Sequence, residues 1–260
     1  MVKASNKCEK CKHSLPTENT KCPCGFIKEP KNYFNNFHKE LKKRPAYGTY
    51  LFLTIFILVN VQMISIDLSE NYFSAFISWQ PEVPIAQETL YRYGGINQEA
   101  ILANFEGWRL ISSSFLQNNC SLNFLVILSF LCIALPLERI IGTKSFVRIF
   151  IVSGLFGNLS TLYFLQPGIV HGTLFFPIFG IISALLSLCY KNRDIYPNRF
   201  FKGICYGSFA FFVLGLQNYF PTPELTAGLL LAMVYGASDI LLRNANINFQ
   251  PPILIQPKKD

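Results

Sequence analysis

Long apolar segments alternate with polar segments along most of this chain. Six apolar runs stand out, each of about 17 to 21 residues, which is the length that crosses a hydrocarbon core about 30 Å thick as a helix. These runs are Tyr47–Ile66, Ser121–Leu137, Phe146–Leu165, Leu174–Tyr190, Phe200–Phe220 and Leu225–Leu242. The pattern predicts an all-α polytopic membrane protein with six transmembrane helices.

The composition supports a membrane location. Hydrophobic residues make up 51% of the chain and charged residues only 15%, whereas a soluble domain carries about 25% charged residues. Buried helices of a large soluble protein are the less favoured alternative. The first 46 residues are polar and rich in lysine, so we expect no cleavable signal peptide.

The placement of charge predicts the topology. If the six runs cross alternately, all of the 23 Lys and Arg residues except Arg92 and Arg109 fall on one side. This is the positive-inside pattern, so we expect an integral membrane protein in a plasma or inner membrane with both termini in the cytoplasm. The basic residues then act as topology signals that contact the lipid bilayer, and nucleic acid is not an expected partner.

The same pattern divides the chain into regions. We expect a small cytoplasmic unit at 1–30, a basic juxtamembrane linker at 31–46, a membrane domain at 47–242 and a cytoplasmic tail at 243–260. The outward loop at 67–120 is long and aromatic. Because long loops without structure of their own are uncommon, it should fold as a membrane-embedded or interfacial element.

Two close cysteine pairs lie in the first 30 residues. They are Cys8 and Cys11, then Cys22 and Cys24 in a Cys-Pro-Cys-Gly sequence. Four thiolates at this spacing favour one structural, tetrahedral Zn²⁺ in a zinc ribbon, which would supply the folding energy of so small a unit. A disulfide pair or a redox motif is the alternative, and the cytoplasmic placement argues against it. Such a ribbon could bind a cytoplasmic protein partner.

Three further motifs resemble those of one known family. The loop contains Gly94-Gly95-Ile96-Asn97 and then Trp108-Arg109-Leu110-Ile111-Ser112, the second run ends in Leu137-Glu138 with Gly142 four residues later, and the third carries Ser153-Gly154 with Gly157-Asn158. Together they resemble the rhomboid intramembrane serine proteases over about residues 94–236. The resemblance implies a six-helix rhomboid bundle in which Trp108 and Arg109 shape the first loop and Glu138, Gly142, Gly180 and Gly228 are structural. The small residues of the third run should let helices approach closely.

The resemblance also implies where a catalytic centre would lie. Rhomboids carry a nucleophilic Ser on the fourth helix, a His on the sixth, and a His and an Asn on the second that help to hold the oxyanion. Aligning Ile178-Phe179-Gly180 with the family pattern puts Phe175 at the Ser position, or Leu174 if the alignment slides by one residue, with Thr173 and Phe176 at flanking Gly positions. The His position is Glu224 or Leu225. The oxyanion positions are Leu122 and Val126 without gaps, or Asn119 and Asn123 with a shift of three.

Phe175 and Leu174 carry no nucleophile, and the base position holds no histidine, whereas acyl transfer needs an activated nucleophile and donors for the oxyanion. The nearest hydroxyl–imidazole pair is Thr173 with His171, and we expect Ser183 to bond back to its own helix carbonyl. Asp239, near the end of the sixth run, should be solvated. We therefore interpret the chain as a pseudoprotease that binds transmembrane helices of client membrane proteins. The alternatives are an active intramembrane serine endopeptidase with a rebuilt site and, less favoured, a small transporter.

Overall fold

The computed structural model describes residues 41–66, 85–118, 123–191 and 223–242, together with the single residues Lys39 and Gly203. This part of the chain is helical, and its only β-type pairing is an isolated antiparallel bridge between Ile96 and His171. The helices are α2 (Tyr47–Ile66), α4 (Gln87–Arg92), α5 (Gln98–Leu102), α6 (Arg109–Ser112), the 3₁₀ turn η1 (Ser113–Phe115), α7 (Asn123–Ile141), α8 (Thr143–Phe164), α9 (Phe175–Lys191) and α11 (Pro223–Leu242).

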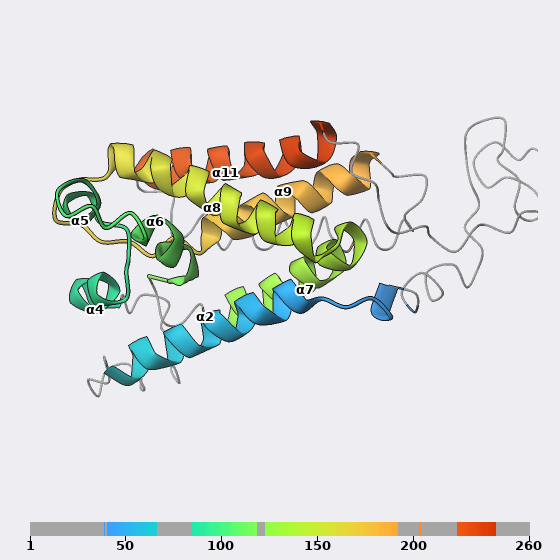
Figure 1. Cartoon of the computed structure of the whole chain (residues 1–260), viewed down its shortest axis with the longest axis horizontal. Coiled ribbons are helices and arrows are strands. Elements are labelled where there is room, and N and C mark those ends of the chain that lie inside the picture. Colours follow the sequence, from blue (N-terminus) through green and yellow to red (C-terminus); the bar gives the residue numbers. More distant parts are fainter. Residues whose placement is uncertain are drawn as a thin grey trace, which may run out of the picture.

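Three long helices, α8, α9 and α11, lie side by side and make the most extensive contacts in the described structure (Figure 1). Glycines lie where these helices touch. A Cβ atom at Gly236 of α11 would collide with the carbonyl oxygen of Gly180 on α9, and one at Gly228 would come within 2.7 Å of the carbonyl oxygen of Gly157 on α8. The small residues therefore allow backbone-to-backbone packing, as expected for the third apolar run.

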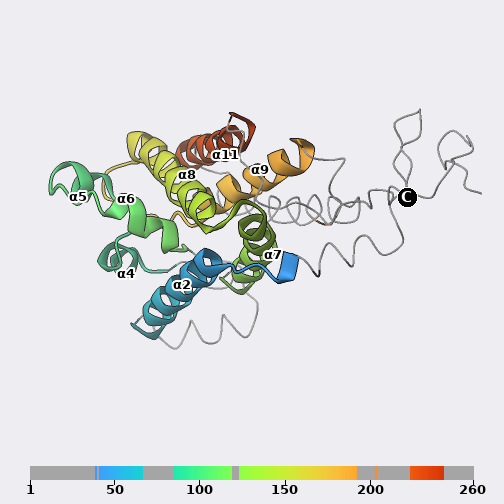
Figure 2. The same cartoon turned by 45° about the vertical axis from the view of Figure 1, so that its right-hand side comes forward.

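The helices α2 and α7 pack against α8 and α9 on the side opposite to α11, as the two views in Figures 1 and 2 show. Their inward faces supply aromatic rings to the main apolar core. The ring centroids of Phe52 on α2 and Phe150 on α8 are 4.2 Å apart in a stacked arrangement, and Phe130 of α7 meets Phe150 edge-on at 6.2 Å. Aromatic pairs in such geometries contribute about 0.5–1.5 kcal/mol beyond the area that they bury.

The short helices α4, α5 and α6 gather at one end of the long helices (Figure 1). They belong to the long loop that was expected to fold, and residues 85–118 do form a structured element. Its backbone is joined to the segment before α9, because the amide of Ile96 donates to the carbonyl of His171 at 2.8 Å and the amide of His171 donates to the carbonyl of Ile96 at 3.1 Å.

Helices occupy five of the six predicted apolar segments, and the sixth, Phe200–Phe220, lies outside the described residues. By length and apolar composition, α8 alone of the described helices clearly qualifies as a membrane span, and Tyr47–Met63, Phe175–Lys191 and Thr226–Leu242 are shorter apolar helices. The helix of the second run continues past the apolar segment that ends at Leu137, because α7 extends to Ile141, next to Gly142. The helix passes through Glu138 since that carboxylate is hydrogen-bonded inside the protein.

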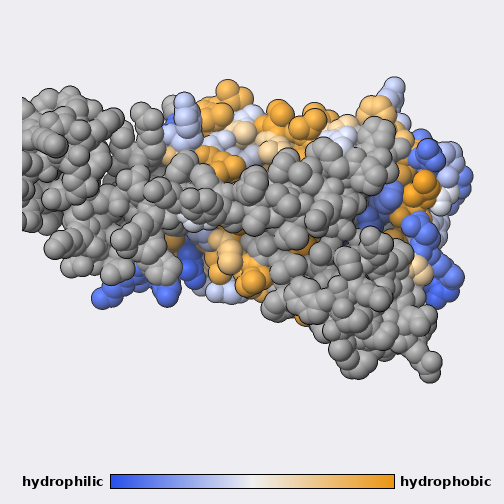
Figure 3. Space-filling view, turned by 180° about the vertical axis from the view of Figure 1, so that it is seen from behind, coloured by the Kyte–Doolittle hydropathy of each residue, from blue (hydrophilic) through white to orange (hydrophobic). Residues whose placement is uncertain are grey.

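The described surface of the long helices is largely apolar, and Figure 3 shows such patches on one face. Exposed large side chains on α2 and α11 include Tyr50, Leu51, Leu58 and Val61, and Leu230, Leu231 and Val234. Contiguous apolar surface of this kind is typical of an interface with lipid or with another protein.

Candidate functional site

The predicted nucleophile segment lies where the chain enters α9. Its backbone is held against the end of the long loop, because the amide of Thr173 donates to the carbonyl of Ser113 at 2.8 Å and the amide of Leu174 donates to that of Leu116 at 3.1 Å. Helix α9 begins one residue later, at Phe175. The entrance of the helix is therefore fixed by main-chain hydrogen bonds to residues 113–116.

A small apolar pocket adjoins this entrance. Its water-accessible volume is about 10 Å³, which is close to the minimum volume that holds one water molecule. Two positions that the sequence assigned to the catalytic centre line it together, Leu174 for the nucleophile and Val126 for the oxyanion Asn. The complete lining consists of Phe52, Phe56, Phe115, Val126, Phe130, Phe150, Leu174 and Ile178. No lining side chain carries a polar atom, so the pocket has neither a nucleophile nor a donor for an oxyanion.

The other nucleophile candidate, Phe175, is also enclosed. It is 1% exposed, and its ring centroid lies 6.5 Å from that of Phe179, one turn further along α9. Next to it, Phe176 occupies a position where the family pattern has a glycine. Cβ atoms at Gly157 of α8 and Gly228 of α11 would come within 2.6 and 2.7 Å of its ring. Glycines on two neighbouring helices therefore leave the space that this ring fills.

Neither of the two candidate hydroxyl groups of this segment, those of Thr173 and Ser183, is bonded to an imidazole. The hydroxyl of Ser183 donates to the carbonyl of Gly180 at 2.9 Å, as expected from its place on an apolar helix. Thr173 is fully buried, and its hydroxyl has no hydrogen-bond partner in the protein. His171, for its part, joins the bridge to Ile96 through its backbone. The structure thus does not bring Thr173 and His171 together as a nucleophile and a base.

Several predicted residues cannot be placed. Leu122, Asn119 and the four cysteines at positions 8, 11, 22 and 24 lie outside the described residues. Glu224, Leu225 and Asn123 fall within helices, but their side chains are not described. Within the residues that are described, no group of three or more His, Cys, Asp or Glu side chains could hold a metal ion.

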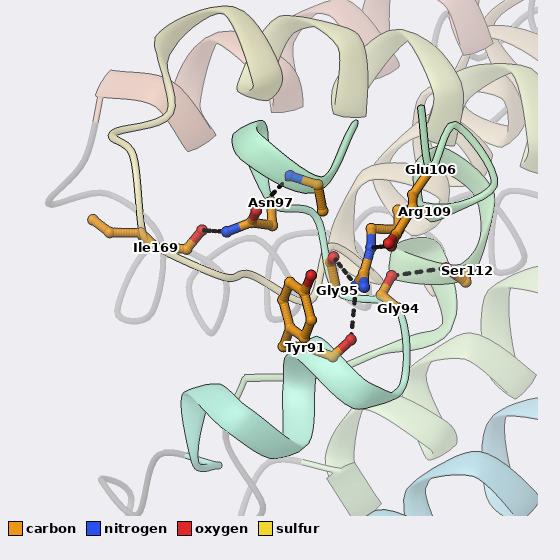
Figure 4. A network of polar contacts seen from close by, with 9 residues as sticks. Tyr91, Gly94, Gly95, Asn97, Glu106, Arg109, Ser112 and Ile169 are labelled. Atoms are coloured by element: carbon orange, nitrogen blue, oxygen red, sulfur yellow. Dashed lines mark hydrogen bonds and ion pairs between the residues drawn. The ribbon is translucent and has the colours of Figure 1, made fainter. Parts of the chain in front are cut away.

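The Trp108-Arg109 motif organises the short helices, as Figure 4 shows. The guanidinium of Arg109 donates to the backbone carbonyls of Tyr91 at 2.7 Å and Gly95 at 3.2 Å, and it pairs with Glu106. It also lies 4.1 Å from the ring centroid of Tyr91 and 5.0 Å from that of Trp108. The side chain is 4% exposed, and its charge is neutralised inside the loop by the carboxylate of Glu106.

Asn97 joins this loop to the segment that precedes α9. Its side-chain oxygen accepts from the amide of Ala100 at 2.9 Å and caps α5, while its amide nitrogen donates to the carbonyl of Ile169 at 3.2 Å (Figure 4). The hydroxyl of Ser112 donates to the carbonyl of Gly94 at 2.7 Å. The residues of the first-loop motif therefore have a structural role, because they hold the loop together and join it to the segment before α9.

Glu138 is fully buried where α2, α7 and α8 meet. Its carboxylate accepts hydrogen bonds from the amide of Gly48 at 2.8 Å, from the amide and the hydroxyl of Thr49 at 2.6 Å each, and from the hydroxyl of Thr143 at 2.6 Å. A glutamate at the edge of the membrane is expected to pair with Arg139 or another buried donor, and the donors in the structure are the N-terminal amides of α2 with the hydroxyls of Thr49 and Thr143. A carboxylate is favourable there because free N–H groups and the helix dipole attract negative charge.

Gly142 connects α7 directly to α8. It has a φ of 85° and its amide donates to the carbonyl of Glu138 at 2.7 Å. This left-handed conformation is readily available to glycine, which explains why the motif requires one after the helix end. The link places Thr143 beside the carboxylate.

Asp239 is not solvated, contrary to the expectation from sequence. It is 8% exposed, and its carboxylate forms two hydrogen bonds with the guanidinium of Arg148 on α8, at 2.9 and 3.3 Å. The two residues are 91 positions apart in sequence, so only the packing of α8 against α11 reveals the pair.

Together, a bundle of apolar helices, a first loop built around an arginine and an apolar pocket at the entrance of α9 characterise the described part of the chain as an apolar helical bundle. A family model for the rhomboid domain matches residues 104–239. The chain belongs to the rhomboid family, whose members are membrane proteins.

Several curated proteins of Arabidopsis thaliana are similar to this chain. "Inactive RHOMBOID-like protein 8" is 24% identical over 187 residues, which cover 65% of this chain and 51% of that protein. "RHOMBOID-like protein 4" is 29% identical over 43% of this chain and 28% of its own length, and "RHOMBOID-like protein 5" is 30% identical over 46% and 37%. The chain thus spans about half the length of these relatives or less. No solved structure gives a significant match.

Proposed function

We propose that this protein is a rhomboid pseudoprotease, which binds transmembrane helices of client membrane proteins in the bilayer and does not cut them. The observation that carries the proposal is the entrance of α9. There Leu174 lines an apolar pocket and Phe175 is enclosed at 1% exposure, so neither candidate position offers an attacking oxygen.

Similarity to an inactive relative supports the proposal. "Inactive RHOMBOID-like protein 8" is named as inactive and aligns over 65% of this chain. The apolar pocket adds a physical reason, since an oxyanion would be desolvated there without a compensating donor, which is costly. The exposed apolar faces of α2 and α11 offer surfaces on which a client helix could pack.

An active serine or threonine protease is the second candidate. It is favoured by Thr173, whose buried hydroxyl lies just before the N-terminus of α9 and two residues after His171 in sequence. Activity would require the imidazole to reach that hydroxyl, to within about 2.6–3.2 Å.

A fluorophosphonate probe distinguishes the two candidates. The purified protein in mild detergent or in bilayers should form no covalent adduct, because the hydroxyl of Ser183 is bonded to the carbonyl of Gly180 and that of Thr173 is bonded to no protein group that could act as a base. The measurement is intact mass followed by peptide mapping, with an active rhomboid protease labelled in parallel as the positive control. An adduct on Thr173 or Ser183 would overturn the pseudoprotease proposal.

The binding half of the proposal is tested separately. Cross-linking in native membranes and purification should recover client membrane proteins at full length, and recovery of fragments cut within their transmembrane segments would contradict it. Leu230→Ala and Val234→Ala on the exposed face of α11 should lower the recovery of clients, whereas Leu102→Ala, equally exposed on the short helix α5, is the matched apolar control and should leave it unchanged.

The amino-terminal cysteines carry a separate proposal, that Cys8, Cys11, Cys22 and Cys24 hold one structural Zn²⁺ and form a docking unit for a cytoplasmic protein. Full-length protein kept reduced should contain one zinc per chain by elemental analysis. Cys8→Ser should lose the metal because three thiolates bind zinc more weakly than four, whereas Cys132→Ser on α7 should retain it. Metal-free protein that has been purified without chelators would refute the zinc site.

A further inference from the structure

Two buried polar side chains at the entrance of α9 have no hydrogen-bond partner in the protein. Gln117 is 0% exposed, and neither its Nε2 nor its Oε1 is paired with a protein group. Thr173 is likewise 0% exposed, with an unpaired Oγ1. Buried polar atoms are nearly always hydrogen-bonded in folded proteins, either to protein or to ordered water.

The backbone places these two residues on adjoining segments. The amides of Thr173 and Leu174 donate to the carbonyls of Ser113 and Leu116, just before Gln117. Gly172 packs so closely that a Cβ atom there would lie 2.9 Å from the amide nitrogen of Gln117. The amide of Gly172 also donates to the side-chain oxygen of Asn118. The segments 116–118 and 172–174 are therefore in direct contact.

The chemistry of the two groups matches a small ligand with both donors and acceptors. The carboxamide of Gln117 offers two N–H donors and one acceptor oxygen, and the hydroxyl of Thr173 offers one of each. Complete burial leaves no opening for a peptide or a lipid head group. A water molecule is small enough, and it carries two donors and two acceptors.

We infer that an ordered water molecule is bound at this junction and bridges the carboxamide of Gln117 to the hydroxyl of Thr173. The neighbouring side chains Leu116 and Leu174 are 1% and 4% exposed, so apolar groups separate the water from the surface. The water joins residues 116–118 to the entrance of α9, and it is independent of the proposed client binding.

A double-mutant cycle tests the bridge. Gln117→Met and Thr173→Val each remove one partner while nearly conserving shape, and the double variant removes both. Because a shared water couples the two positions, the unfolding constant of the double variant should differ by about fivefold or more from the product of the two single effects, a coupling of about 1 kcal/mol. The measurement is an SDS unfolding titration in mild detergent.

Ser183→Ala combined with Gln117→Met is the control cycle. Ser183 lies ten residues beyond Thr173 in sequence, about 15 Å along the axis of α9 if the rise is helical throughout. These two effects should simply multiply. If the effects of Gln117→Met and Thr173→Val also multiply within experimental error, the junction has no shared water and the inference fails.

A direct observation separates a water bridge from contact between the two side chains. A density map that resolves ordered solvent should show a peak within hydrogen-bond reach of both Gln117 and Thr173. A dry junction in such a map would overturn the inference even if the two positions were coupled.

Discussion

Glu138→Ala should be among the most destabilising single substitutions in the protein, with an expected loss of about 3 to 5 kcal/mol in the free energy of unfolding. The carboxylate accepts four hydrogen bonds from Gly48, Thr49 and Thr143 in a fully buried position. Removing it leaves two amides at the start of α2 without an acceptor. An SDS titration that follows helix content or tryptophan fluorescence measures the change.

Two variants define the cause of that loss. Glu138→Gln keeps the shape and one acceptor oxygen but turns N–H groups toward donors, so its loss should be intermediate. Glu88→Ala removes a carboxylate from an ion pair with Arg92 whose side chains are 64% and 74% exposed, and it should cost less than about 0.5 kcal/mol. Stability of Glu138→Ala within 1 kcal/mol of wild type, in a fully folded protein, would show that α2 is held by other contacts.

Gly236→Ala should have the second large effect, a loss of about 3 kcal/mol or more from steric overlap in a packed core. The added methyl would collide with the carbonyl oxygen of Gly180 and lie 2.7 Å from its carbonyl carbon. Backbone atoms of α9 cannot rotate away as a side chain can, so α9 and α11 would have to separate. The intrinsic preference of alanine over glycine in a helix, about 1 kcal/mol, acts in the opposite direction and is too small to compensate.

Gly107→Ala is the matched control for this substitution. A Cβ atom at Gly107 would meet nothing within 4 Å, so the unfolding free energy should change by less than about 0.5 kcal/mol. The same titration compares the two variants. Equal stability of Gly236→Ala and Gly107→Ala would mean that α9 and α11 are not in backbone contact in the membrane.

Hydrophobic pattern alone located most of the helices. The run Tyr47–Ile66 coincides with α2, and Leu174–Tyr190 differs from α9 by one residue at each end. This works because the interior of a membrane requires both apolar side chains and internally satisfied backbone groups over a fixed length. The apolar run stops at Leu137 whereas α7 continues through Glu138 to Ile141, so hydrophobicity alone does not mark the end of this helix.

The family motifs located the structural residues of the first loop and the second run, but not their partners. Arg109 was expected to shape the loop, yet the carbonyls of Tyr91 and Gly95 that it holds could not be named from sequence. Backbone groups carry no sequence signature, so a contact that uses them is visible only in the fold. For the same reason, the amides of Gly48 and Thr49 could not be identified from the sequence as partners of Glu138.

What the sequence by itself determined is the chemical inventory: apolar runs of spanning length, the rhomboid motifs, and apolar residues at the nucleophile positions. Only the tertiary structure decided which residues each candidate site residue contacts. It placed Leu174 with Val126 in one apolar pocket, the ring of Phe176 against Gly157 and Gly228, and Gln117 beside the segment of Thr173. The physical reason is that sequence fixes what each side chain can do, whereas burial and hydrogen bonding depend on residues brought together from distant parts of the chain.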